Sequence, residues 1–319
     1  MSYTISVAMA LYNGERYLQE QLESIYKQSL QPNELIVCDD GSTDNSDSLF
    51  EEFVTQNGLG RNWKLFKNEN NLGLIKNFLH CASLCNCDVV FFSDQDDIWD
   101  NCKIEKMIKV FENNPDAEAV VCAYQAVNAD LREEKSLVER IKRKNSSVTK
   151  KSKVPLTTQT KTMLSGGLTL AVKRTVLAEI TPYILANELT YDIPIGLICA
   201  ARGTLYRIDE PLVLHRVHLS NSGSPELNVM NRLKNIERHI AGREFELKHL
   251  ICFLDAPGVD LHEFEVHEIK REILARKSAI ECMKHRKIGG LLKLLFRKNA
   301  YDNKMMDVAN LACTLYNLF

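Results

Sequence analysis

The 319-residue sequence predicts an α/β fold in which a mostly parallel sheet is covered by helices on both faces and is followed by a C-terminal helical region. Short apolar runs rich in β-branched and aromatic residues alternate with longer amphipathic stretches through the first hundred residues. This alternation is typical of right-handed βαβ units. Polar and acidic residues follow the apolar runs. Because ligands bind beyond the carboxyl ends of parallel strands, these polar residues are expected to line one crevice.

Four apolar runs in the first third of the chain predict strands, at residues 5–11, 35–38, 63–66 and 89–92. Helical patterns with one apolar face separate them, at about residues 17–25, 43–53 and 75–84. Two further short strands are expected at residues 205–208 and 212–214, on either side of Asp209-Glu210-Pro211.

The middle of the chain contains a basic stretch of low apolar content at residues 131–154. It is interpreted either as a mobile solvated loop or as a lid that orders over an anionic ligand. Apolar residues return at 163–172. The pair Gly166-Gly167 in this run predicts either a close approach of the backbone to a ligand or a bulge.

From about residue 225 onward the pattern is helical. We therefore expect a first domain at residues 1–224 and a C-terminal helical region at residues 225–319. Residues 288–298 form a basic amphipathic stretch. Such a helix either packs on the first domain or lies on an anionic membrane surface, and the sequence leaves both open.

The composition excludes several classes of protein. The net charge of −2 argues against a general nucleic-acid binder. The N-terminus lacks the basic and apolar segments of a signal peptide, and no apolar run approaches the roughly 18 residues of a spanning helix. The ten cysteines are scattered, without the paired spacing of a structural zinc site. A cytoplasmic, reducing location is expected.

The strongest functional signal is a cluster of acidic residues after the strand at 89–92. Asp94, Asp96 and Asp97 follow that strand within five positions. Carboxylates gathered at one strand end repel one another unless a cation lies among them, and hard divalent cations prefer oxygen ligands. The alternative interpretation is an ordinary polar loop.

Other candidate residues also follow predicted strands or begin predicted helices. Asp39 could accept a hydrogen bond from a nucleobase with Tyr12 beside it, and Lys76 could face a nucleotide or only solvent. Asp192 begins an apolar segment and is either a general base or a helix cap. His218 could complete a metal site begun by carboxylates.

Six motifs occur together in one order. They are Ala10-Leu11-Tyr12-Asn13-Gly14, Asp39-Asp40-Gly41-Ser42-Thr43-Asp44, Asn68-Glu69-Asn70-Asn71-Leu72-Gly73 with Lys76-Asn77, Ser93-Asp94-Gln95-Asp96-Asp97-Ile98-Trp99, Tyr191-Asp192, and His215-Arg216-Val217-His218 with Asn221. On these motifs, residues 3–223 resemble a glycosyltransferase of family 2. The resemblance is to its inverting enzymes of the Rossmann-like GT-A fold, and among them to the bacterial rhamnosyltransferase-like branch.

The resemblance implies a donor site for a nucleotide-sugar. Asp39 would contact the nucleobase beside Tyr12, and Lys76 would face the nucleotide. Asp94, the first acid of the Asp-X-Asp motif, would face the ribose. Asp97 would lie near the donor sugar. Arg216 would lie near the diphosphate.

The resemblance also implies the chemistry. Asp96 and His218 would hold Mg²⁺ or Mn²⁺ on the diphosphate, and Asp192 would be the catalytic base of a single displacement with inversion. The implied reaction moves a sugar from a UDP- or dTDP-sugar to a hydroxyl of a lipid-linked glycan, in bacterial O-antigen or capsule synthesis. The expected location is cytoplasmic, and peripheral on the cytoplasmic face of the inner membrane if the basic amphipathic stretch at residues 288–298 lies on the membrane rather than on the first domain.

The chain departs from the family pattern near both substrates. Leu11 stands where many relatives have Thr, Tyr191 replaces a His or Glu, and Ile193-Pro194-Ile195 replaces an aromatic pair. These differences leave the donor sugar and the acceptor open. The alternative function is a non-catalytic nucleotide-sugar-binding or scaffold protein of a polysaccharide assembly complex.

Overall fold

The computed structural model describes residues 2–132, 151–156, 166–218 and 235–295, together with residues 310–311 and 313–314. Most of the basic loop predicted at residues 131–154 therefore lies outside the described residues. Residues 219–234, which include Asn221 of the last motif, lie outside them as well.

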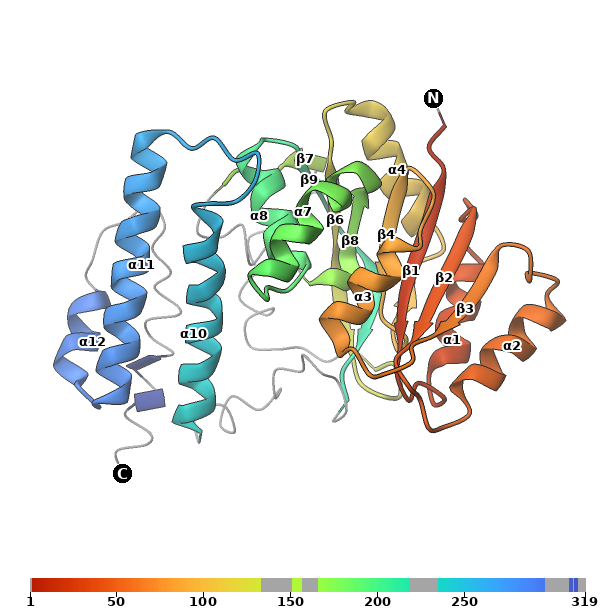
Figure 1. Ribbon diagram of the computed structural model, residues 1–319, viewed down its shortest axis with the longest axis horizontal. Helices are drawn as coiled ribbons and strands as arrows, with labels where there is room; N and C mark the ends of the chain where they lie inside the picture. The colour runs from red at the N-terminus through yellow and green to blue at the C-terminus, as the bar shows by residue number, and fades with distance from the viewer. Residues whose placement is uncertain are drawn as a thin grey trace.

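The four strands predicted in the first third are confirmed and form one half of the sheet (Figure 1). They are β1 (Ile5–Leu11), β2 (Glu34–Asp39), β3 (Trp63–Lys67) and β4 (Val89–Ser93). They lie in the order β3-β2-β1-β4, and each adjacent pair is parallel. Their carboxyl ends therefore meet at one edge, as predicted.

The other half of the sheet contains the remaining described strands. These are β5 (Ile98–Trp99), β6 (Ala119–Val127), β7 (Lys151–Lys153), β8 (Leu170–Lys173) and β9 (Leu205–Arg216). Strand β8 lies antiparallel between β4 and β6, and β9 is parallel to β6 but antiparallel to β5 and β7. The predicted α/β class is confirmed, and the sheet as a whole is mixed.

One sequence prediction about this half is wrong. Residues 205–208 and 212–214 are not two strands but parts of the single strand β9. The pairing of β9 with β6 continues past Pro211 because register shifts at Cys122/Ala123 and Ala123/Gln125 take up the irregular residues. His215 and Arg216 are consequently the last residues of a strand rather than part of a loop.

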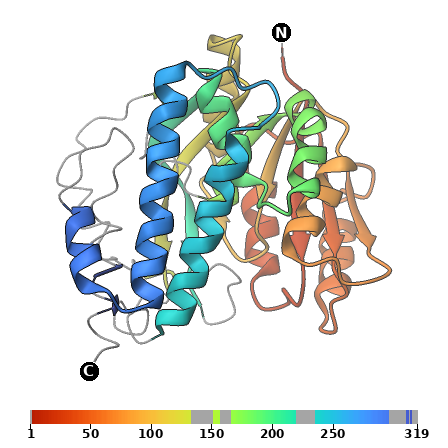
Figure 2. The same cartoon turned by 60° about the vertical axis from the view of Figure 1, so that its left-hand side comes forward.

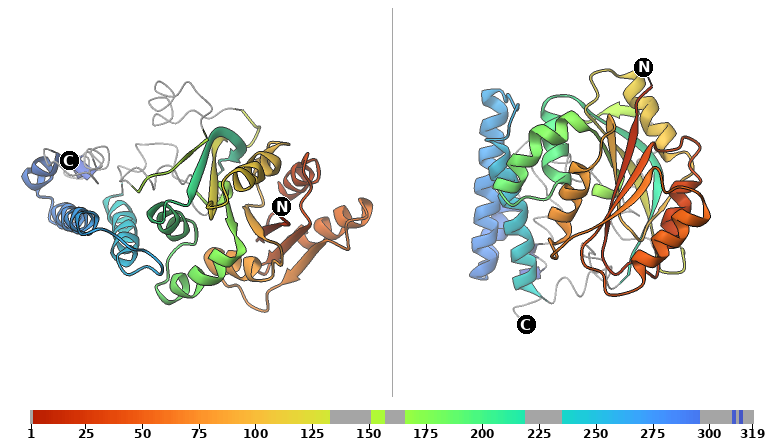
Figure 3. Two further views of the ribbon diagram at one scale, coloured as in Figure 1. Left: turned by 90° about the horizontal axis from the view of Figure 1, so that it is seen from above. Right: turned by 45° about the vertical axis from the view of Figure 1, so that its right-hand side comes forward.

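Helices cover both faces of the sheet, as Figure 3 shows. One face carries α1 (Leu18–Tyr26), α2 (Ser46–Gln56) and α4 (Lys103–Asn113). The other face carries α3 (Leu74–Ser83), α7 (Arg174–Ala186) and α8 (Asp192–Ala201). Alternate residues of β1 point to opposite faces, so Val7 and Met9 join the first apolar cluster and Ala8 and Ala10 the second.

The C-terminal helices extend the second cluster. Helices α10 (Ile236–Phe253) and α11 (Glu263–Lys284) lie side by side, and α12 (Ile288–Leu295) packs on α11 (Figure 2). Helix α10 contacts α8, and Leu247 and Phe253 of α10 are buried in the same apolar cluster as α8. Packing on the first domain is therefore seen for α10. Among the described helices, none is long and apolar enough to cross a membrane.

Candidate active site

The loops after β1, β2 and β4 meet at the carboxyl edge of the sheet. Leu11 is paired with Asp39, and Met9 with Ser93, so Tyr12, Asp39 and Asp94 come to the same edge. The Gln95 side chain connects two of the loops, because its Oε1 accepts from Tyr12 N at 2.7 Å and its Nε2 donates to Tyr12 O at 2.9 Å. These two hydrogen bonds hold the loop after β1 against the loop after β4.

The residues predicted to contact the nucleotide differ in exposure. Tyr12 is 51% exposed, and Lys76 is also exposed. Asp39 is buried, and its Oδ1 accepts from the Ser42 amide at 3.1 Å and from the Ser42 hydroxyl. Tyr12 and Lys76 are thus accessible to a ligand. Asp39 is the last residue of β2, where the loop after that strand begins.

The neighbouring Asp40 has a structural role. Its two oxygens accept from the amides of Leu72 at 2.7 Å and Gly73 at 2.8 Å, and from Asn68 Nδ2 at 2.8 Å. These bonds hold the loop between β3 and α3 in place, and Lys76 lies in the first turn of α3. The two adjacent acids thus differ in role: Asp39 is a predicted nucleotide contact, whereas Asp40 holds the loop before α3 in place.

The two residues predicted to bind a metal are brought together. His218 Nε2 lies 2.9 Å from Asp96 Oδ2, although the two residues are 122 positions apart. The His218 ring also packs against Tyr17, with ring centroids 5.0 Å apart. Only tertiary folding creates this pair.

Asp97 and Arg216, predicted to contact the donor, are instead buried. Asp97 is 0% exposed, and its Oδ1 bonds to His215 Nδ1 at 2.9 Å and to the Arg216 amide at 3.1 Å. Arg216 is 1% exposed and donates to the Asp96 carbonyl at 3.0 Å, to the Ala129 carbonyl at 2.7 Å and to Glu20. Both side chains anchor the acidic loop to the end of β9, and their place near the donor stays a prediction.

The acidic groups lie close enough to affect one another's ionisation. Burial raises the pKa of Asp94 well above its usual value, and the charges of Asp97, Asp96 and Asp192 raise it further. Burial opposes protonation of His215, but its bond to Asp97 and the nearby acids outweigh this and raise its pKa to about 9. His215 is therefore cationic at neutral pH and partly offsets the acidic cluster.

Asp192 is the first residue of α8 and lies near enough to this cluster for its charge to act on Asp94. The residue before it, Tyr191, is buried; its ring stacks on Phe92 at 4.5 Å and lies tilted against Phe78 at 4.9 Å between ring centroids. Tyr191 also explains the second glycine of the pair, because a Cβ on Gly167 would lie 2.5 Å from Tyr191 Cζ. The close approach predicted at Gly167 is therefore to Tyr191, and no ligand is needed to explain it.

The Asp96–His218 pair fits a divalent cation that substrate oxygens would share. Asp96 Oδ2 and His218 Nε2 lie within hydrogen-bonding distance of each other, at 2.9 Å. A carboxylate oxygen and an imidazole nitrogen are both ligands that divalent cations take in proteins. Within the described residues, no group of three or more His, Cys, Asp or Glu side chains is arranged to hold a metal alone.

Comparison with known proteins identifies the family. The sequence pattern of glycosyl transferase family 2 matches residues 6–171, more than half of the chain. The chain belongs to glycosyl transferase family 2. It therefore carries a glycosyltransferase domain, which confirms the predicted family and enzyme class.

Individual relatives match different shares of this family 2 chain. Glycosyltransferase GlyG of Streptococcus pneumoniae is 34% identical over 39% of this chain and 40% of its own length. The dTDP-rhamnosyl transferase RfbG of Shigella flexneri is 28% identical over 72% of this chain and 78% of its own. The chain thus spans about two fifths of GlyG but most of RfbG.

Solved structures confirm the fold. Staphylococcus aureus TarS 1–349, in complex with UDP-GlcNAc, superposes with a TM-score of 0.59 at 15% identity, over 99% of this chain and 90% of that one. The same TarS fragment in complex with UDP gives a TM-score of 0.58 at 17% identity. At these identities the likeness shows the fold alone.

Near the acidic loop of this family 2 chain, the structure places residues that sequence reasoning did not select. Lys103 is fully buried, donates to the Leu168 carbonyl at 2.8 Å, and lies 3.5 Å from the centroid of the Trp99 ring. Burial lowers its pKa to about 8. The sequence could have indicated that Lys103 is unusual, because it shares a helix face with Met107 and Phe111, where an apolar residue is expected. Tyr17 and Glu20, which contact Arg216, carry no such signal.

Proposed function

We propose that the chain transfers a sugar from a UDP- or dTDP-sugar to a hydroxyl of a glycan, with inversion at the anomeric carbon. One observation carries the proposal. Asp94, Asp96 and His218 lie together at the carboxyl edge of the sheet, with Asp192 near enough for its charge to affect Asp94. This set would provide donor contacts, a cation site and a base at one edge of the sheet.

Asp192 is the base in this proposal. It would remove the proton from the acceptor hydroxyl as that oxygen attacks the anomeric carbon, on the face opposite the leaving diphosphate. One displacement of this kind inverts the configuration, and no covalent nucleophile is required. Asp192 is partly exposed at the start of α8, where an acceptor could reach it.

Asp96 and His218 would hold Mg²⁺ or Mn²⁺. A divalent ion bound there would neutralise charge on the leaving diphosphate as a Lewis acid. Tyr12, Asp39 and Lys76 are proposed to contact the nucleotide, and Asp94 the ribose. Asp97 and Arg216 are proposed to keep Asp96 and the end of β9 in place, in line with their burial.

The donor and acceptor classes rest on the relatives. RfbG carries a dTDP-rhamnosyl transferase name, and the TarS fragment was solved with UDP-GlcNAc. These names support a dTDP- or UDP-sugar as the donor. The acceptor is proposed to be a lipid-linked glycan of bacterial O-antigen or capsule synthesis.

The proposal is tested by nucleoside diphosphate release from a panel of UDP- and dTDP-sugars, with lipid-linked glycan acceptors present. Asp192→Asn is expected to lower kcat by about 10²- to 10⁴-fold, the range of a positioned base. Asp260→Asn is the matched control, because Asp260 is exposed in the loop between α10 and α11. Equal turnover of the Asp192→Asn variant and the wild type would refute the base. Unchanged activity under full chelation would refute the metal role of Asp96 and His218.

We further propose that residues 1–224 are the transferase domain and that residues 225–319 attach it to the cytoplasmic face of the inner membrane. Leu292 and Lys293 of α12 are exposed, which supports a surface contact of this helix. Co-sedimentation with anionic vesicles tests it. Binding should fall when Lys293, Arg297 and Lys298 are changed to Ala, and unchanged sedimentation would contradict it.

A further inference from the structure

The C-terminal helix α10 contacts the segment directly before Asp192. His249 of α10 is 3% exposed. Its Nε2 lies 3.1 Å from the Thr190 amide nitrogen and 3.0 Å from Thr190 Oγ1, and its Nδ1 lies 2.9 Å from the Phe245 carbonyl oxygen. Thr190 is two residues before Asp192, so a residue of the C-terminal helical region contacts the segment that carries the proposed base.

These contacts fix the chemical form of His249. The Phe245 carbonyl can only accept, so Nδ1 must carry the hydrogen. The Thr190 amide can only donate, so Nε2 must be the unprotonated acceptor. His249 is therefore a neutral imidazole in one tautomer, and it pairs a partly buried backbone donor for which an apolar residue would offer no acceptor.

The same helix and the loop after it also hold the far end of α8. Arg202, the C-cap residue of α8, donates to the carbonyls of Pro257 at 2.9 Å and Gly258 at 3.0 Å. It also bonds to Glu179 of α7. The C-terminal region thus contacts both ends of the helix that begins with Asp192.

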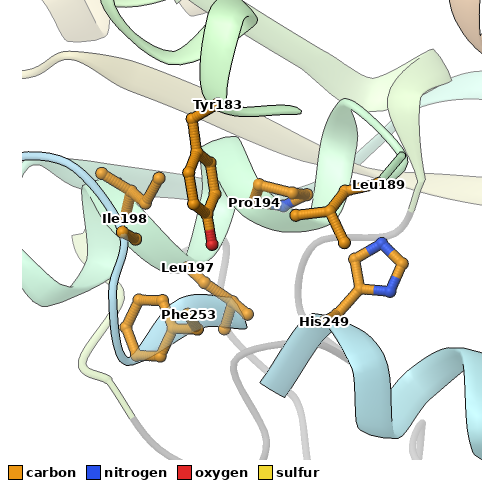
Figure 4. Close-up of a pocket in the computed structure, with 8 residues that line it drawn as sticks. Tyr183, Leu189, Pro194, Leu197, Ile198, His249 and Phe253 are labelled. Atoms are coloured by element: carbon orange, nitrogen blue, oxygen red, sulfur yellow. The ribbon is translucent and has the colours of Figure 1, made fainter. Parts of the chain in front are cut away.

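Between these two ends, apolar residues of α8 and α10 belong to one cluster. Figure 4 shows Pro194, Leu197 and Ile198 of α8 facing His249 and Phe253 of α10 around a small pocket. On the opposite side, Tyr191 is stacked on Phe92. Thr190 and Tyr191 are therefore held from two sides, by α10 and by the sheet, and these two contacts together limit the positions that Asp192 can take.

We propose that His249 is a positioning residue for Asp192, and that the C-terminal helical region is for this reason part of the catalytic unit. The inference rests on the proposed role of Asp192 as base. His249 does not touch the substrate in this scheme. It acts by fixing the backbone at Thr190, and a displaced base lowers turnover steeply because catalysis depends on geometry.

The test compares two replacements at His249 with the full chain. His249→Leu removes the acceptor, and it is expected to lower kcat about 10- to 100-fold while the donor KM changes less than about 3-fold. The donor KM is spared because the proposed donor contacts lie on the loops after β1, β2 and β4 and at the start of α3, not on α8 or α10. His249→Gln keeps a hydrogen-bond acceptor for the Thr190 amide, because the Gln side chain carries a carbonyl oxygen as well as an NH₂ donor. This variant is expected to retain kcat within about 5-fold of the wild type.

A double-mutant cycle separates positioning from general destabilisation. In the Asp192→Asn background, His249→Leu is expected to cause no further loss of kcat, because the group that it positions is already gone. If His249→Leu does not fold, Thr190→Val replaces it in the cycle. That variant removes the hydroxyl contact to His249 and leaves the backbone bond, with an expected loss in kcat of about 3- to 10-fold.

The outcomes distinguish this inference from the proposed function. Wild-type turnover of Asp192→Asn would refute the base, and the inference with it. An active enzyme that depends on Asp192 but is unaffected by His249→Leu would overturn only the inference. Equal losses in His249→Leu and His249→Gln, or an additive loss in the double variant, would also overturn it.

Discussion

The contact between Gly167 and Tyr191 makes a sharp prediction about stability. Gly167 begins a short 3₁₀ turn, η2 (Gly167–Thr169), that precedes β8. An added Cβ would lie 2.5 Å from Tyr191 Cζ and 2.8 Å from Cε2, and closer still to the hydroxyl oxygen. Carbon atoms in contact normally lie about 3.5–4.0 Å apart, so Gly167→Ala requires the ring to move by roughly 1 Å.

The Tyr191 ring has little room for that movement. It is stacked on Phe92 and lies tilted against Phe78, and both of these are almost fully buried. Overpacking of a close-packed core typically costs about 1–3 kcal/mol. We expect Gly167→Ala to lower the free energy of unfolding by about that amount. Because Tyr191 precedes Asp192, turnover is also expected to fall.

Urea unfolding followed by circular dichroism measures the effect. Gly242→Ala is the matched control, since Gly242 lies in α10 with open space around it, and the same substitution there should stabilise by about 0.5–1 kcal/mol. Tyr191→Phe in the Gly167→Ala background should recover part of the loss by removing the hydroxyl oxygen. Unfolding of Gly167→Ala at the wild-type urea concentration, or equal destabilisation by Gly242→Ala, would refute the steric argument.

Two further predictions concern buried polar groups. Asp40→Asn should lower the free energy of unfolding by about 1–3 kcal/mol, because one amide oxygen cannot replace two carboxylate oxygens that accept from Leu72, Gly73 and Asn68; wild-type urea unfolding of the variant would contradict this. Burial raises the pKa of Tyr183 to about 12 from the ordinary value near 10. The neutral phenol is therefore favoured in the folded state, and the stability linked to it is present below pH 10 and is lost as pH rises towards 12. Its hydroxyl has no partner among the described residues, so Tyr183→Phe should be as stable as the wild type at pH 8 and should lose stability less steeply between pH 10 and 12. Parallel pH–stability curves for the two proteins would refute that assignment.

Much of the first domain could be predicted from the sequence. The apolar runs at residues 5–11 and 89–92 form β1 and β4 because a strand buried on both faces needs continuous apolar residues, a pattern that is local in the chain. The crevice edge follows from the same pattern, since parallel strands end at one edge. Local patterns alone therefore suffice to place Asp94 and Asp96 near the loops of Tyr12 and Asp39, and the strand register confirms that placement.

The roles of individual side chains at that edge were less predictable. Asp96 and Asp97 are neighbours in the chain, yet Asp96 faces His218 and Asp97 is buried against His215. Which of two adjacent acids faces the crevice depends on where β9 ends, and β9 ends there only because bulges carry it past Pro211. No local pattern contains that information.

The sequence by itself determined the α/β class, the order of the first four strands along the chain and the family. Each of these depends on hydrophobic periodicity or on motifs of adjacent residues, which are local in the chain. Only the tertiary structure decided that Asp97 and Arg216 are anchors, that Gly167 makes room for Tyr191, and that His249 contacts Thr190. Each of these depends on two segments that are 24 or more residues apart in the chain. Such contacts are set by the packing of whole helices and strands, so they become visible only when the chain is folded.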